Sequence, residues 1–359
     1  MPRVSVIIST YNGEEHLLDS VTSILTQTFS DFELIIADDG STDCTRELLK
    51  SFADPRIRVL YNERNLGIAA SQNQAISAAT GEYLALMDHD DISLPHRLQT
   101  QVCYLDSHSE IGVVASNSIN IDRNNEVTSE ARYPVDEAEF AWNTLILGCP
   151  NVHTTLMIRR SAFDRVDGYD NRLRYACDYD LISRLVLSTQ VANFEEPLVR
   201  WREHAGSVSR SKTDALMTEA AAITKHNASL LLKDTSIEES TWQALRVLIA
   251  SPPSGDVSLS SEEVNGAFTL LLELQSSFFR IKNFSRGRIE RHQRQLHFMW
   301  GKHSLALALR GKGTRDLKCR LELLKWSAKL LFGLVRSRSQ AEPLPALLEA
   351  AHSKTLPRS

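Results

Sequence analysis

"VSVIISTYNGEEHLLDSVTSILTQ", residues 4–27, decides the fold that we expect for this chain. It begins with a short β-branched run at 4–9, passes through a polar loop at 10–16, and continues with apolar residues at helical spacing. The same order follows the apolar runs at 32–37 and 57–62, and a fourth run stands at 83–87. Strands that are apolar on both faces and alternate with helices predict an α/β fold with a mostly parallel sheet flanked by helices.

The pattern changes after residue 110. We expect strands at 111–118 and 153–158, helices at 137–147 and 178–188, and two strands around Pro197 within 191–204. After residue 209 the pattern is almost wholly helical, with helices expected at 213–233, 237–250, 262–282 and 315–336. We therefore place a domain boundary near residue 210, between a first domain of residues 1–210 and a mainly helical C-terminal region of residues 211–359.

The composition is that of a globular protein, with 42% hydrophobic and 24% charged residues in 359. A net charge of −5 argues against general nucleic-acid binding. Between residues 279 and 338, however, sixteen Lys or Arg face only three Asp or Glu. The basic amphipathic segment 315–338 within this region fits two alternatives, which are peripheral contact with an anionic membrane and docking on protein. A homo-oligomer is also compatible with the sequence.

The first residues lack the charged lead and long apolar core of a signal peptide, and no apolar run reaches the roughly 18 residues of a membrane span. The cysteines at 44, 103, 149, 177 and 319 are scattered and form no CxxC pair, which is typical of reduced thiols. The expected location is the cytoplasm, with the inner face of the membrane as a site of contact.

Polar loops follow the predicted strands, and ligands of parallel sheets bind beyond the carboxyl ends of the strands. In "DDGSTD" (38–43) a helix cap accounts for residues 41–43 but leaves Asp38 and Asp39 unexplained. A carboxylate at that place suits a nucleobase N–H or a ribose hydroxyl. Gly67 precedes a predicted helix N-terminus, which suits a phosphate. The alternative for each loop is an ordinary start of a helix.

"DHDD" (88–91) ends the fourth apolar run. Asp88 and Asp90 would lie on one side of an extended segment, with Asp91 facing elsewhere. Mg²⁺ or Mn²⁺ on a diphosphate needs only one or two protein carboxylates, so this DxD pattern predicts a divalent cation. The alternative is a solvated turn before "SLP".

Five segments together carry a resemblance. "SVIISTYNGEEHLLDSVTSILTQTFSDFELIIADDGSTD", "NLGIAASQNQAISAATGEYLALMDHDD", "VHTTLMIRRSAFDRVDGYD", "CDYDLISRL" and "WREHAGSVS" resemble, in this order, segments of the family 2 inverting glycosyltransferases. The likeness covers about residues 3–210 and implies the nucleotide-diphospho-sugar transferase (GT-A) fold. It also implies metal-dependent transfer of a hexosyl or N-acetylhexosaminyl group from a nucleotide diphosphate, with uridine diphosphate expected from the family. The acceptor would be a saccharide or lipid-linked hydroxyl in bacterial polysaccharide or glycolipid assembly.

Carried over by position, the resemblance implies roles for individual residues. The donor pocket would be lined by Thr10, Tyr11, Asn12, Glu14, Asp38, Asp39, Asn65, Gly67, Asn73 and Asp88. Asp39 or Asp38 would contact the base, and Asp88 would serve the ribose or the metal. Asp90 would bind the metal, and His204 would add a contact to the metal or the diphosphate. Asp178 would be the general base, with Asp180 as the rival assignment.

Two positions depart from the family pattern. Gln72 stands where an Arg often precedes Asn73, and Cys177 stands where a Glu often precedes Asp178. These departures leave a non-catalytic nucleotide-sugar-binding subunit as the alternative function. A nucleotidyltransferase is not favoured, because its Gly-rich loop would follow the first strand, whereas "GKGTR" lies at 311–315.

Overall fold

A computed structural model of the protein describes residues 1–149, 151–233, 236–249, 259–282, 284–310 and 317–331. The chain divides into two compact units, the first formed by residues 1–236 and 274–289 and the second by residues 237–273 and 290–359. The boundary that the sequence suggested near residue 210 lies within the first unit. Each unit is therefore described by itself.

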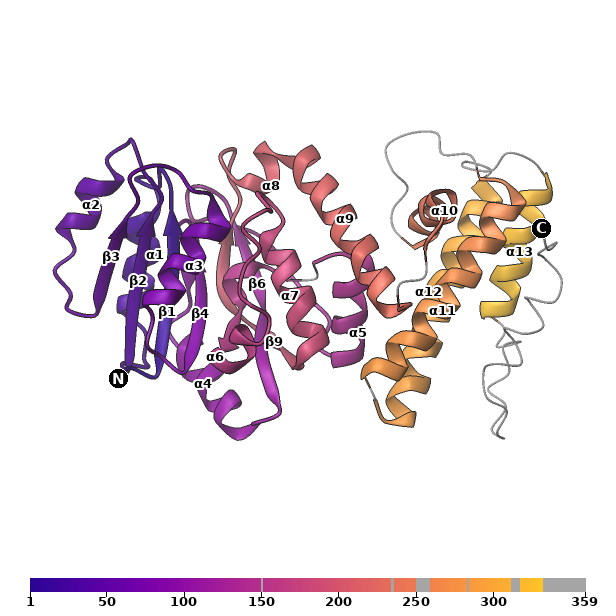
Figure 1. The fold of residues 1–359 in the computed structure, drawn as a ribbon, viewed down its shortest axis with the longest axis horizontal. Coiled ribbons are helices and arrows are strands. Elements are labelled where there is room, and N and C mark those ends of the chain that lie inside the picture. The colour runs from indigo at the N-terminus through magenta and orange to yellow at the C-terminus, as the bar shows by residue number, and fades with distance from the viewer. Residues whose placement is uncertain (150, 234–235, 250–258, 283, 311–316, 332–359) are drawn as a thin grey trace. The chain divides into compact units, whose positions relative to one another are not determined.

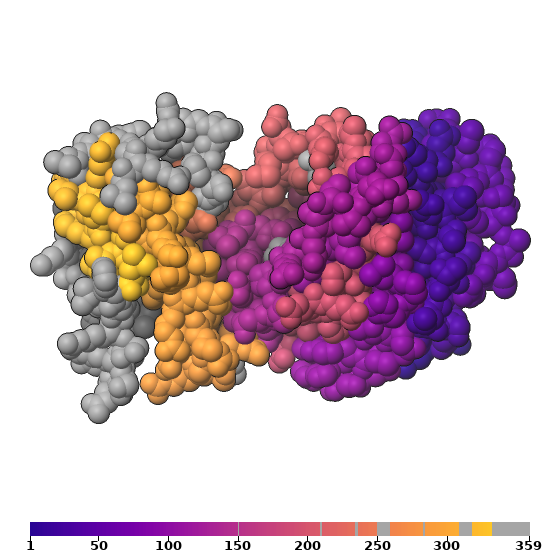
Figure 2. All heavy atoms as spheres, turned by 180° about the vertical axis from the view of Figure 1, so that it is seen from behind, coloured from indigo at the N-terminus to yellow at the C-terminus, as the bar shows by residue number. Residues whose placement is uncertain are grey.

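Four parallel strands form one half of the sheet in the first unit, in the order β3-β2-β1-β4 (Figure 1). They are β1 (Val4–Thr10), β2 (Phe32–Asp38), β3 (Ile57–Tyr61) and β4 (Tyr83–Asp88), connected through helices α1 (Leu17–Leu25), α2 (Thr45–Ser51) and α3 (Ile68–Ala78). Core side chains such as Ile8, Leu34 and Leu86 are fully buried, because helices cover this half on both faces. The predicted α/β pattern is confirmed here. Figure 2 shows the same residues from behind, in indigo and purple, as one continuous surface.

The other half of the sheet is mixed. It continues from β4 through β8 (Met157–Arg159), β6 (Ile111–Ile121), β9 (Gln190–Arg202) and β5 (Ile92–Ser93), with β7 (Val127–Ala131) beside β6. Strand β8 runs antiparallel to both neighbours, whereas β9 runs parallel to β6. The sheet as a whole thus combines a parallel half with a mixed half.

Two predictions for this half are wrong. Residues 153–155 form a 3₁₀ turn before β8 rather than part of a strand, with Leu156 N donating to His153 O. Residues 190–202 form one strand rather than two. Proline lacks the N–H that a ladder requires, so the register shifts where Pro197 faces Asn117. The Asn117 side chain then donates to Glu195 O at 2.7 Å and keeps the strand continuous.

Helices complete the first unit. They are α4 (Arg97–Ser107), α5 (Glu137–Trp142) with a π-helical turn at Asn143–Leu147, α6 (Arg160–Asp164), α7 (Cys177–Ser188), α8 (Val208–Ser211) and α9 (Thr213–Leu231). Residues 274–289 join this unit through specific contacts. Lys282 Nζ donates to Val186 O and Thr189 O at the end of α7, and Arg288 pairs with Glu137 at 2.7 Å.

The second unit is helical. It contains α10 (Glu239–Ile249), the first part of α11 (Ser261–Lys282), most of α12 (Arg286–Arg310) and α13 (Leu317–Leu331). Helix α12 was not predicted from the sequence. In the core, the Trp326 ring stacks on Phe268 with centroids 4.8 Å apart, and Ser327 Oγ donates to Gly301 O.

The helical spacing of segment 315–338 predicts an apolar side that includes Leu321, Leu324 and Ala328, but helix α13 buries a different side. The buried positions are Cys319, Leu323, Ser327 and Leu330, whereas Leu321 and Leu324 are 48% and 38% exposed. The remainder of that segment, at 315–316 and 332–338, lies outside the described residues. Within the described part of the chain, no helix combines the length and apolar character that crossing a membrane requires.

Candidate functional site

The ends of three parallel strands bring the predicted acidic loops to one edge of the sheet. Thr10 pairs in register with Asp38, and Ser9 pairs with Asp88. The backbone of Asp39 also donates to Thr10 O at 2.8 Å. The loops that follow β1, β2 and β4 therefore begin beside one another, although up to 78 residues separate their strand ends in the sequence.

The first loop is held by the second through several hydrogen bonds. Asn12 has a positive φ of 50°, and its Oδ1 accepts from Thr42 N at 2.8 Å. Glu14 Oε2 accepts from Cys44 N at 2.8 Å, at the start of α2. Tyr11 is 44% exposed, so its ring is open to a ligand, and the buried Thr10 Oγ1 has no hydrogen-bond partner in the described part of the chain.

Asp38 and Asp39 are both buried, but they have different partners. Asp38 accepts from Arg46 Nε at 2.6 Å and from Ser41 N at 3.2 Å. Asp39 accepts from Asn62 Nδ2 at 3.1 Å and from the backbone N–H groups of Leu66 and Gly67 at 2.8 and 2.9 Å. An ionised carboxylate has about four acceptor positions, so Asp39 keeps about one for a ligand.

The third loop also has a well-defined geometry. Gly67 has a φ of 95°, and the space where a Cβ would stand is open, so a ligand can approach its backbone closely. Asn65 is exposed beside it. Asn73, in contrast, is used within the protein, because it donates to Tyr169 O at 2.8 Å and accepts from Tyr169 N at 3.0 Å. Gln72 is fully buried and donates to Ser9 Oγ.

The acids at the end of β4 each have a different neighbour. Asp88 Oδ1 lies 3.0 Å from His153 Nδ1, and Asp90 Oδ2 lies 2.9 Å from His204 Nε2. Asp91 points inward, where its Oδ1 accepts from Arg202 N and its Oδ2 has no hydrogen-bond partner among the described residues. Burial, together with Asp90 and Asp88, raises the pKa of Asp91 well above its ordinary value. Burial would also raise the pKa of Asp90, but His89 and His204 lower it by more.

Arg202 is a buried cation that the sequence reasoning did not single out. Its Nε donates to Asp90 O at 2.6 Å, and its Nη1 donates to the carbonyl oxygens of residues 122 and 123. His204 follows it two residues later, just beyond the end of β9. The His16 ring stands 5.2 Å from that of His204, and burial followed by the charge of Arg202 lowers the pKa of His16.

Asp178 is the second residue of α7, and it lies close enough to Asp88 and His153 for their charges to act on its pKa. His153 Nε2 lies 2.7 Å from Tyr169 Oη, while its Nδ1 faces Asp88. The Asp178 Oδ1 accepts from the backbone N–H of Tyr179 at 2.7 Å, and no side chain in the described ranges bonds to this carboxylate. Burial raises the pKa of Asp178 and Asp88 adds to the rise, whereas His153 opposes it. A carboxylate of raised pKa is a stronger base, and this one is free to accept a proton.

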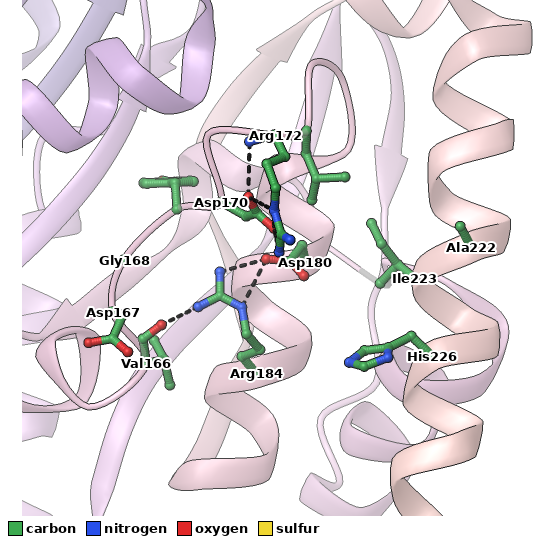
Figure 3. A pocket seen from close by; sticks show the side chains of 12 residues that line it. Val166, Asp167, Gly168, Asp170, Arg172, Asp180, Arg184, Ala222, Ile223 and His226 are labelled. Carbon is green, nitrogen blue, oxygen red and sulfur yellow. Dashed lines mark hydrogen bonds and ion pairs between the residues drawn. The ribbon is translucent and has the colours of Figure 1, made fainter. Parts of the chain in front are cut away.

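Asp180 lies on a different side of α7 and borders a cavity of about 480 Å³ (Figure 3). Its Oδ2 accepts two hydrogen bonds from Arg184, which also donates to Val166 O. Ala222, Ile223 and His226 of α9 form the far wall. An ion-paired carboxylate is a poor proton acceptor, so the geometry favours Asp178 over Asp180 as a base.

Among the described residues, no group of three or more His, Cys, Asp or Glu side chains is placed to hold a metal ion. Asp90 and His204 are nevertheless adjacent, and they supply one oxygen and one nitrogen donor. His153 stands in the quoted segment "VHTTLMIRR", whose sequence fits either a wall of the site or a core histidine. Arg202 stands two residues before His204 in "WREH", so its nearness to a predicted site residue was the available signal.

Comparisons with known proteins add independent information. The family model described as "Glycosyl transferase family 2" matches residues 5–167. The chain is 36% identical over 215 residues to the "Putative glycosyltransferase EpsE" of Bacillus subtilis, which covers 58% of this chain and 76% of that protein. It is 34% identical over 209 residues to "Uncharacterized glycosyltransferase MJ1057" of Methanocaldococcus jannaschii, covering 56% and 71%. The crystal structure of S. aureus TarS 1–349 in complex with UDP-GlcNAc aligns with a TM-score of 0.55 at 17% identity, covering 92% of each chain.

Proposed function

This chain belongs to glycosyltransferase family 2 and has the GT-A fold, and we propose that it is an inverting enzyme with Asp178 as its general base. The proposed reaction transfers a sugar from a nucleotide diphosphate to an acceptor hydroxyl. The position of Asp178 carries the proposal. Among the described residues its carboxylate accepts only from Tyr179 N, and burial, with the charge of Asp88 adding to it, raises its pKa.

In the proposed step, Asp178 takes the proton of the acceptor hydroxyl while the acceptor oxygen bonds to the anomeric carbon. The bond from that carbon to the diphosphate oxygen breaks, and the nucleoside diphosphate leaves from the opposite face. A single displacement of this kind inverts the anomeric centre through an oxocarbenium-like state. The pair of His153 and Tyr169 keeps Asp88 in place beside the leaving group.

We propose a uridine diphosphate sugar as the donor. The complex of TarS with UDP-GlcNAc supports offering this class first, although its likeness to this chain speaks for the fold alone. The exposed Tyr11 ring suits contact with a base, and Asp39 retains acceptor capacity for an imide N–H. The open backbone at Gly67 and the exposed Asn65 lie on the neighbouring loop.

A divalent cation, Mn²⁺ or Mg²⁺, belongs to the proposal. Its fit rests on the crowding of acids at 88–91, where burial, followed by the charges of Asp90 and Asp88, raises the pKa of Asp91. Asp90 and His204 would hold the ion from the protein, with Asp88 nearby. Two protein ligands suffice when diphosphate oxygens supply others. Such an ion would neutralise the charge that develops on the diphosphate.

We also propose a lipid-linked or saccharide acceptor and peripheral contact with an anionic membrane through α13. Leu321 and Leu324 are exposed, and Lys318, Arg320 and Lys325 are exposed on the same helix. Exposed leucines beside cationic side chains are the combination that an anionic interface binds. The assembly of polysaccharide or glycolipid is the proposed setting.

The deciding experiment compares Asp178→Asn with Asp180→Asn. A panel of nucleotide sugars with Mn²⁺ identifies the donor by thermal shift, and release of nucleoside diphosphate measures turnover. Asp178→Asn should abolish turnover while donor binding persists, whereas Asp180→Asn should retain turnover because its carboxylate is paired with Arg184. Full activity of Asp178→Asn would refute the assignment, and donor binding without any turnover by the wild type would favour the non-catalytic alternative.

A further inference from the structure

One side chain of α9 binds the backbone segment that leads directly to Asp178. Glu219 Oε1 accepts from Arg174 N at 3.1 Å, and its Oε2 accepts from Tyr175 N and Ala176 N, each at 2.9 Å. These three N–H groups immediately precede α7, which begins at Cys177. A residue 41 positions after Asp178 in the sequence therefore determines where this helix starts.

Glu219 orders the backbone that enters α7 rather than capping the first turn of the helix. A side chain at the N-cap usually fixes the entry into a helix. Here the N-cap is Ala176, which has no side chain capable of capping, and its N–H is one of the three that Glu219 binds. A carboxylate near a helix N-terminus is favoured by the helix dipole, and hydrogen bonds to an ionised group are about twice as strong as neutral ones.

A second contact joins the same two helices beside the base. The Tyr179 hydroxyl, one residue after Asp178, lies 3.0 Å from Thr224 Oγ1 on α9. This contact joins two neutral hydroxyl groups and involves no backbone N–H. It therefore holds α7 against α9 without ordering the N–H groups of residues 174–176. Thr224 thus offers a matched comparison for Glu219.

The segment before residue 174 is anchored at its other end by Asn73, which holds the backbone of Tyr169 and bonds the Asn171 side chain. Residues 170, 172 and 173 border the 480 Å³ cavity (Figure 3). Glu219 is therefore the described side chain that fixes the end of this segment next to α7. Removing the anchor at 174–176 would release the start of α7 together with Asp178.

We propose that Glu219 is a positioning residue for Asp178, which it holds at the reacting hydroxyl by ordering the N–H groups of residues 174–176. This inference rests on the proposed function, because it takes Asp178 as the base. It assigns a catalytic requirement to α9, which lies outside the residues 5–167 that the family model matches. A purely stabilising role would instead lower the melting temperature without changing the turnover number of the folded enzyme.

The experiment compares Glu219→Ala, Glu219→Gln and Thr224→Val in the full chain. Turnover is measured as nucleoside diphosphate release from the panel sugar that the wild type turns over fastest, and donor affinity is measured separately. We expect Glu219→Ala to lower kcat about 10- to 100-fold with donor Kd within about twofold, because a misplacement near 1 Å costs that much. Glu219→Gln should recover part of kcat, since one amide oxygen can accept two of the three bonds. Thr224→Val should keep kcat near the wild-type value.

Hydrogen exchange gives a readout that does not depend on the substrate. The exchange rate of the N–H groups of residues 174–176 should rise most in Glu219→Ala and by an intermediate amount in Glu219→Gln. It should stay at the wild-type value in Thr224→Val. A kcat within about twofold of wild type in Glu219→Ala, or equal losses in Glu219→Ala and Thr224→Val, overturns the inference. If Glu219→Ala does not fold, unchanged kcat and exchange in Glu219→Gln overturn it. Activity of Asp178→Asn tests the proposed function separately, so the two failures are distinguishable.

Discussion

Replacing Asp39 with Asn separates two roles that this carboxylate can have. The sequence assigns Asp39 to the nucleobase, whereas the structure shows it accepting three hydrogen bonds from residues 62–67. An Asn side chain has one acceptor oxygen, so its NH₂ group must face at least one buried donor. We therefore expect the third loop to lose order even when no nucleotide is present.

The magnitude follows from those bonds. Losing one hydrogen bond to a charged group costs about 1.5–3 kcal/mol, and a buried N–H left unsatisfied costs about 1–3 kcal/mol. We expect a total loss of about 2–4 kcal/mol in the free energy of unfolding, after discounting for overlap between these costs. In a unit of this size that corresponds to roughly 4–16 °C in melting temperature.

The assay is urea unfolding of the donor-free protein, together with hydrogen exchange at Leu66 and Gly67. Asp38→Asn serves as the comparison, because Asp38 bonds Ser41 and Arg46 and makes no bond to residues 66 and 67. Faster exchange at 66 and 67 should be specific to Asp39→Asn. Unchanged stability and exchange in Asp39→Asn, with only donor binding lost, would refute our reasoning and leave the nucleobase as its only role.

Three further predictions concern the cation, the base and the helical unit. Asp90→Ala and His204→Ala should each weaken Mn²⁺ binding in the presence of UDP by about tenfold or more, measured by electron paramagnetic resonance, and wild-type affinity in both variants would contradict the site. Turnover should fall with decreasing pH through an apparent pKa above that of an ordinary aspartate, because Asp178 must be deprotonated to act and burial raises its pKa; an acid limb in the range of an ordinary aspartate would contradict this role. The double variant with Leu321→Glu and Leu324→Glu should float less with phosphatidylserine vesicles than the wild type, whereas Val127→Glu, at another exposed apolar position, should float like the wild type. Equal flotation of the wild type and both variants would remove the membrane proposal.

Much of the parallel half of the sheet could be predicted, because each of its strands and helices has a recognisable pattern within a short stretch of sequence. Apolar runs of five to seven residues alternate with amphipathic helices, and the pairing of Thr10 with Asp38 follows once the strands are parallel. The mixed half was harder to predict because its pairings are non-local. Strand β9 shows this, since a Pro in the sequence suggests a break that the Asn117 side chain prevents.

The residues that hold the acidic side chains in place were harder to predict than the acidic residues themselves. Asp88, Asp90 and Asp178 stand in short patterns, whereas the groups that bind or surround them do not. Arg202 lies 112 residues from Asp90 and Glu219 lies 43 residues from Ala176, so neither could be assigned from spacing alone. Helix α12 was missed because its polar and basic residues obscure an apolar period.

The acidic cluster is tolerated because buried cations offset its charge without occupying its carboxylates. Arg202 donates to Asp90 through the main-chain carbonyl, and Arg97 donates to Leu86 O and Leu156 O. Burial lowers the pKa of Arg97 to about 10, so this guanidinium stays charged at neutral pH. Had either arginine paired directly with Asp88 or Asp90, the carboxylate oxygens would have been taken by the protein itself. Because both guanidinium groups donate mainly to other groups, the side-chain hydrogen bonds to Asp88 and Asp90 among the described residues come from the imidazoles of His153 and His204, and a ligand can compete with those.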